Sequence, residues 1–141
     1  AIGTKAPEII LPLPGGPVIM SDIPEKYVLV IFWASWCPGC KELLPHIKDI
    51  YRDYHKSGLE VVAISIDKDK SEYNAALQKG QYSWINYSEL KGWDCSIAYD
   101  YGVRATPTMV LLDAERKIIA KPRDPEMLIE KLRQMGLRPI L

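Results

Sequence analysis

Two cysteines separated by two residues are the part of the sequence best suited to chemistry. Cys37 and Cys40 stand in the stretch FWASWCPGC, after an apolar run and before an amphipathic segment. Such a pair can cycle between a dithiol and a disulfide, hold a metal ion, or form a static disulfide. The surrounding elements and the other possible ligands help to choose among these three kinds of site.

The flanking residues predict a strand followed by a helix. Residues 27–35 form an almost unbroken β-branched and aromatic run, typical of a strand buried on both faces. Apolar side chains then recur at helical spacing from about Pro38 to His55, with Pro45 expected to kink the helix. Cys37 therefore lies where the strand meets the first helical turn, and free N–H groups and the helix dipole favour a thiolate there.

The redox interpretation is favoured over the two others. A zinc site needs about four ligands, and beyond the pair the chain offers only Cys95, His46 and His55. We therefore expect no metal, and no other cofactor. A static disulfide closing so short a loop would stabilise little. With one cysteine at the edge of the helix and one inside it, one thiol can attack a disulfide while the other resolves the product.

The rest of the sequence predicts an α/β fold. Residues 59–67 form a second buried strand, and Asp69 with Glu72 resembles a capping box that opens a helix through about Lys79. The stretch GQYSWINYSELKGWDCS, residues 80–96, is interpreted as a polar and aromatic surface loop. The mixed charges of residues 67–70 are expected to lie in a solvated loop.

The last third predicts two more strands and two helices. A short helix is expected at residues 96–101, a strand at 108–112, and a further strand at 117–121 after a turn at 114–116. Asp124 and Pro125 have the pattern of a helix start, and Gly136 of its end. With two short extended pieces around Pro-Gly-Gly-Pro at the N-terminus, we expect a mixed central β-sheet flanked by helices, with an N-terminal β extension.

Length and charge limit the function classes. The 141 residues fit a single domain, residues 1–141. Eighteen basic residues balance 18 acidic residues, so no nucleic-acid partner is expected. No apolar run is long enough to span a membrane, and no uncleaved signal peptide is expected at the N-terminus.

The segments APEIILPLPGGPVIMSDI, VLVIFWASWCPGCKELLPHI, LEVVAISID and YGVRATPTMVLLD together resemble a thioredoxin-fold protein of the TlpA/ResA-like group, related to the AhpC/TSA superfamily. The resemblance implies that Cys37 is the nucleophile and Cys40 the resolving thiol. It also implies that Thr106 and a cis Pro107 form the loop that faces the disulfide and pairs with bound peptide.

The resemblance also implies a compartment and partners. Such proteins work in the bacterial periplasm or at the outer face of the cytoplasmic membrane, and some of them are anchored to that membrane. They reduce disulfides of client proteins. We expect a monomer that meets client proteins with disulfides or thiols, and that is reduced by an upstream electron donor. Trp36 and Pro38, beside the nucleophile, are expected to contact the client.

Two departures from the resemblance concern proton transfer. Thioredoxin carries a buried aspartate at the position of Ile31, and TlpA/ResA-like proteins often carry a glutamate at the position of Leu43. A buried acid there can relay protons to the resolving thiol. Both positions are apolar in this chain, so the resemblance does not identify the group that exchanges a proton with Cys40.

Two alternatives to a disulfide reductase are considered. One is a non-catalytic binding domain that uses the edge at Thr106 and Pro107 to hold a partner. The other is a peroxiredoxin-like peroxide reductase, which is disfavoured because Ala34 stands where that relative carries a threonine. Cys95 is expected to be a packed residue with an incidental thiol, His46 a surface residue and Trp33 part of the core.

Overall fold

A computed structural model describes residues 1–141. The elements follow one another in the order β1 (Ile10–Leu13), β2 (Gly16–Ile19), η1 (Met20–Asp22), β3 (Tyr27–Trp33), α1 (Pro38–Tyr54), η2 (His55–Ser57), β4 (Leu59–Ser65), α2 (Lys70–Gly80), β5 (Ile85–Ser88), η3 (Gly92–Asp94), α3 (Ser96–Asp100), β6 (Thr108–Leu112), β7 (Ile118–Ala120) and α4 (Pro125–Gln134). The expectation of a mixed sheet flanked by helices, with an N-terminal β extension, is confirmed.

The central sheet has five strands in the order β5-β4-β3-β6-β7. β3 and β4 are parallel, with Tyr27 opposite Leu59 and Trp33 opposite Ser65, so their carboxyl ends meet at one edge. β6 runs antiparallel to β3 on its other side. All seven residues of β3 are buried, as its β-branched and aromatic composition predicts for a strand between two others.

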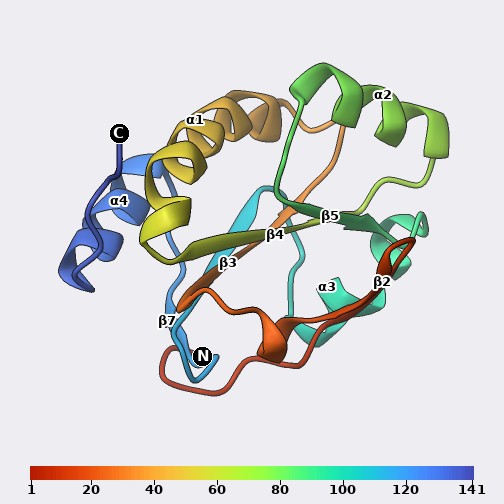
Figure 1. Cartoon of the computed structure of the whole chain (residues 1–141). Coiled ribbons are helices and arrows are strands. Elements are labelled where there is room, and N and C mark those ends of the chain that lie inside the picture. The colour runs from red at the N-terminus through yellow and green to blue at the C-terminus, as the bar shows by residue number, and fades with distance from the viewer.

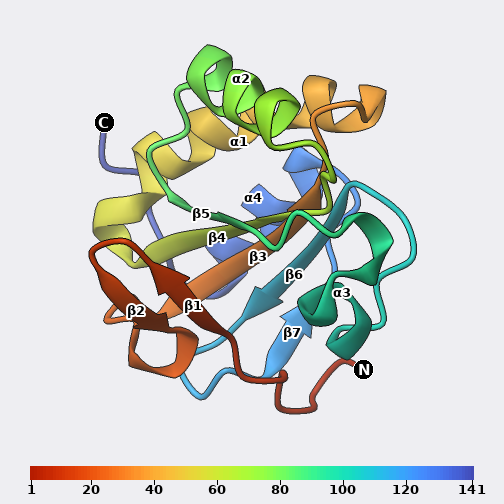
Figure 2. The same cartoon turned by 90° about the vertical axis from the view of Figure 1, so that its right-hand side faces the viewer.

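Helices cover both faces of the sheet (Figures 1 and 2). The two longer helices α1 and α2 lie side by side over one face, and α4 packs against α1. α3 and the β1–β2 hairpin lie over the opposite face. None of the helices combines the length and the apolar character that crossing a bilayer requires.

The helix boundaries follow the local signals in the sequence. The Asp69 side chain accepts hydrogen bonds from the backbone N–H groups of Ser71 and Glu72, which starts α2. Asp124 caps α4 in the same way. After α1 and η2 the chain reverses at Gly58, whose φ of 123° suits glycine alone.

The stretch 80–96 is not the surface loop expected from the sequence. Residues 85–88 form β5, a parallel strand at the edge of the sheet beside β4. Trp84 and Cys95, at either side of it, are buried, whereas Trp93 is exposed. The strand has only four half-buried residues with two polar side chains, so it lacks the periodicity by which strands are predicted.

Candidate active site

The two cysteines lie where β3 gives way to α1. Cys37 is the N-cap of the helix, and Pro38 occupies the first helical position, where its missing N–H is not needed. The backbone N–H of Cys40 donates to Cys37 Sγ over 3.2 Å. Because the first turn of a helix presents free N–H groups and the positive end of its dipole, this position stabilises a negative charge on Cys37 Sγ.

The structure holds the pair in its oxidised form. Cys37 and Cys40 are joined by a disulfide, with their Cα atoms 5.2 Å apart. Cys40 is fully buried and Cys37 is almost so, at 3% exposed. Pro38 is exposed, and Trp36 keeps 51% of its surface exposed, so the two residues that flank Cys37 in the chain form an exposed rim beside it.

The loop before β6 faces the disulfide. The Thr106–Pro107 peptide bond is cis, and Cys37 Sγ lies 3.5 Å from the carbonyl oxygen of Thr106. A Cβ added to Gly39 would stand 3.3 Å from Pro107 Cδ, tighter than most carbon contacts. Any side chain at position 39 would require Pro107 to shift by a few tenths of an ångström, so Gly39 allows the two loops to approach this closely.

A buried carboxylate, Asp67, holds the loop that precedes Cys37. It is 0% exposed, not solvated as its charged neighbours led us to expect. Its carboxylate accepts from the Ser35 N–H at 3.1 and 3.2 Å, and from the hydroxyls of Ser35 and Ser65. Burial, and to a lesser extent the nearby charge of Asp67, raise the pKa of Tyr73 to about 12.

Asp67 is the site residue that sequence reasoning missed. A usable signal existed, because Asp67 and Ser35 both follow parallel strands whose carboxyl ends share one edge of the sheet. Its oxygens accept from serines and not from either cysteine, so it positions the loop. Ile31 and Leu43, the positions where relatives keep an acid, are both buried apolar side chains.

The third cysteine lies outside the disulfide. Cys95 is free and buried, and its Sγ donates to Glu89 Oε2 at 3.4 Å. Burial, with the Glu89 charge adding to it, raises the pKa of Cys95, so this thiol stays protonated and unreactive at neutral pH. This agrees with the expected packing role. His46 is exposed and Trp33 is buried, also as expected.

One cluster could hold a metal ion. Ligand atoms of Glu25, His55 and Glu60 lie within 4.8 Å of one another. Glu60 is near the start of β4, whereas the cysteines follow the end of β3, so the cluster lies at the opposite end of the sheet. It takes no part in the geometry of the cysteine pair.

Comparison with known proteins agrees with this geometry. The model of the AhpC/TSA family matches residues 2–121. The chain belongs to the AhpC/TSA family. Among curated relatives, the thiol-disulfide oxidoreductase ResA of Bacillus cereus is 28% identical over 121 residues, which is 85% of this chain and 68% of that protein. ResA of Bacillus subtilis is 29% identical over 119 residues, covering 83% of this chain and 64% of that protein.

Solved structures of thiol-disulfide oxidoreductases match almost the whole chain. The thioredoxin domain of a thiol-disulfide oxidoreductase from Bacteroides vulgatus superposes with a TM-score of 0.84 at 26% identity, covering 96% of this chain and 97% of that one. A thiol-disulfide oxidoreductase from Bacteroides fragilis gives 0.83 at 28% identity, covering 94% and 99%. The expected resemblance to TlpA/ResA-like proteins of this family is confirmed.

Proposed function

We propose that the protein is a thiol–disulfide oxidoreductase that reduces disulfides of client proteins through Cys37 and Cys40. The observation that carries this proposal is the disulfide at the N-terminus of α1, with Cys37 at the rim and Cys40 enclosed. Relatives with this fold are named for the same activity.

The reaction is an exchange of two electrons. In the reduced enzyme, the Cys37 thiolate attacks one sulfur of a client disulfide, and the other client sulfur leaves as a thiolate. The Cys40 thiolate then attacks Cys37 Sγ, forming the Cys37–Cys40 disulfide and releasing the second client thiol. An upstream dithiol donor restores the reduced enzyme. The burial of Cys40 ensures that the outer thiol meets the client first.

The client is positioned by the residues around the rim. The exposed face of Trp36 offers an apolar contact, and Pro38 borders the same opening. We assign to the backbone of Thr106, beside the cis Pro107, the pairing with an extended client segment. The monomeric state and the extracytoplasmic location implied by the resemblance are part of the same proposal.

Replacing Cys40 by serine tests the proposal, because the mixed disulfide then has no resolving thiol. The variant should accumulate adducts on Cys37 when mixed with a disulfide-containing protein, and a reductant should release them. The matched control is Cys95→Ser, which should form no lasting adduct, since both thiols of the pair remain. No adducts on the first variant, together with no disulfide reductase activity in the parent protein, would contradict the proposal.

A further inference from the structure

A groove between α1 and α2 opens beside the cysteine loop. It encloses about 370 Å³, a volume that fits a ligand fragment or one or two amino-acid side chains. Trp33, Leu44, Ala76 and Tyr82 contribute its apolar surface. Ser35, two residues before Cys37, also lines it. A molecule in the groove therefore borders the segment that presents the nucleophile.

The polar lining of the groove is basic. Lys41, Lys48 and Lys79 line it, and none of its lining residues is acidic. Lys41 directly follows Cys40 in the chain. All three lysines are exposed, and they border the apolar part of the same groove.

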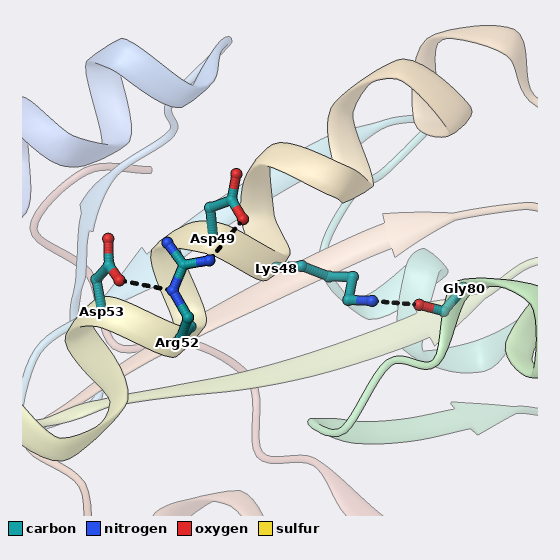
Figure 3. A network of polar contacts seen from close by, with 5 residues as sticks. All are labelled: Lys48, Asp49, Arg52, Asp53 and Gly80. Carbon is teal, nitrogen blue, oxygen red and sulfur yellow. Dashed lines mark hydrogen bonds and ion pairs between the residues drawn. The ribbon is translucent and has the colours of Figure 1, made fainter. Parts of the chain in front are cut away.

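These three positive charges are not neutralised within the protein. Both ion pairs of the chain belong to Arg52, which binds Asp49 at 3.0 Å and Asp53 at 2.9 Å. Figure 3 shows these carboxylates directed toward Arg52, whereas Lys48 extends the other way and donates to the carbonyl oxygen of Gly80 at 2.8 Å. The Lys48–Gly80 bond links α1 to the end of α2 across the groove. In a chain with no net charge, this leaves a local positive patch on an apolar surface.

We propose that this lysine groove binds an acidic segment of the client polypeptide, next to the disulfide that Cys37 attacks. A glutamate or aspartate carboxylate complements the lysines, and an apolar side chain beside it packs on the partly exposed Ala76 and Tyr82. The inference rests on the proposed function and narrows it. Clients with an acidic residue near the reacting cysteine are reduced faster.

Two disulfide peptides that differ at one residue test this specificity. Each carries the same cysteine and apolar neighbours, with either glutamate or glutamine at a position close to the cysteine. The kcat/KM of the parent protein should favour the glutamate peptide by about fivefold at low salt, and high salt should reduce the preference because it screens the exposed charges.

Matched variants locate the effect. The triple variant Lys41→Gln, Lys48→Gln, Lys79→Gln should lose the preference, so that its kcat/KM values for the glutamate and the glutamine peptide become equal. The control triple variant Lys5→Gln, Lys91→Gln, Lys121→Gln removes equal charge from exposed lysines outside the groove and should keep the preference.

Several outcomes would overturn the inference. Equal rates for both peptides with the parent protein would remove the acidic-client specificity while leaving the reductase activity intact. If both triple variants lose the preference for the glutamate peptide equally, that preference comes from the net charge of the protein and not from the groove. If sedimentation shows that the parent and the control variant are dimers and the groove variant is a monomer, the groove binds a second copy of the chain and not a client. No reaction with either peptide would instead count against the proposed function itself.

Discussion

Asp67 connects the cysteine loop to the neighbouring strand through a single buried carboxylate. The Ser35 N–H and the hydroxyls of Ser35 and Ser65 all donate to it. An amide at this position has one acceptor oxygen and an NH₂ group, so it cannot satisfy the same donors. Because the side chain is fully buried, water cannot replace the missing acceptor.

Replacing Asp67 by asparagine should therefore lower the free energy of unfolding by about 2 kcal/mol. It should also slow the attack of Cys37 on a disulfide, since Ser35 helps to fix the loop. Urea unfolding and the rate of adduct formation measure the two effects. The control Asp69→Asn changes an exposed helix cap that asparagine also fills, so the free energy of unfolding should change much less than in Asp67→Asn. Identical behaviour of the two variants would contradict the role of Asp67.

Glu89 gives the protein an acid-dependent contribution to stability. Burial alone raises its pKa, but hydrogen bonds from the hydroxyl of Ser96, the N–H of Ile97 and the thiol of Cys95 outweigh burial and hold the pKa below its ordinary 4.5. Because the folded pKa is lower than the unfolded one, this stabilisation is complete above the unfolded pKa. It is lost as the pH falls through the folded pKa.

The variant Glu89→Gln should remove this part of the pH dependence. The free energy of unfolding of the parent should fall more steeply than that of the variant between about pH 5 and pH 3. Urea titrations across this range measure the slopes. The Glu115→Gln variant, which alters an exposed glutamate in the turn before β7, should keep the parent slope. Parallel curves for parent and Glu89→Gln would show that the contacts of Glu89 contribute nothing to the acid response.

At the scale of elements, Arg116 links the turn before β7 to η1 and to the segment that connects η1 with β3. Its guanidinium donates to the backbone carbonyls of Met20, Ile23, Glu25, Lys26 and Asp113. The side chain is buried, and burial lowers its pKa. Since η1 and the chain after it lead into the central strand β3, this one side chain joins the N-terminal extension to the sheet.

The variant Arg116→Met should cost roughly 3 kcal/mol of stability, because it removes the guanidinium donor from two buried and three partly buried carbonyl groups. Chemical unfolding measures the loss. Arg123→Met, at an exposed position before α4, is the matched control and should unfold like the parent. A loss no greater than that of the control would mean that water or other groups replace the guanidinium.

The elements that could be predicted from the sequence are those with strong local signals. β3 is a continuous apolar run and α2 has an aspartate cap, so both are found where expected. β5 consists of four half-buried residues, and its pairing with β4 depends on the tertiary fold. No local sequence pattern therefore predicts this strand. The burial of Asp67 likewise depends on Ser35, a residue far away in the chain. The cysteine pair was identified because its spacing and the strand and helix signals on either side of it are all local in the sequence.

At the scale of the whole molecule, the chemistry gathers at one edge of the sheet. The carboxyl ends of β3 and β4 carry the cysteine loop and Asp67, and the loop before β6 brings Thr106 to the disulfide. The lysine groove opens from the same edge, between α1 and α2. One rigid sheet thus sets the nucleophile, its supporting carboxylate and the basic groove relative to one another.

The most direct test of this account follows the thiols of enzyme and client in one reaction. The reduced protein is mixed with a protein that contains a disulfide, quenched in acid, alkylated and analysed by mass spectrometry. We predict that Cys37 and Cys40 lose their two thiols as the client gains two, while Cys95 keeps its thiol. Oxidation of the pair without matching client thiols, or client reduction that persists in a Cys37→Ser variant, would contradict electron transfer through this pair.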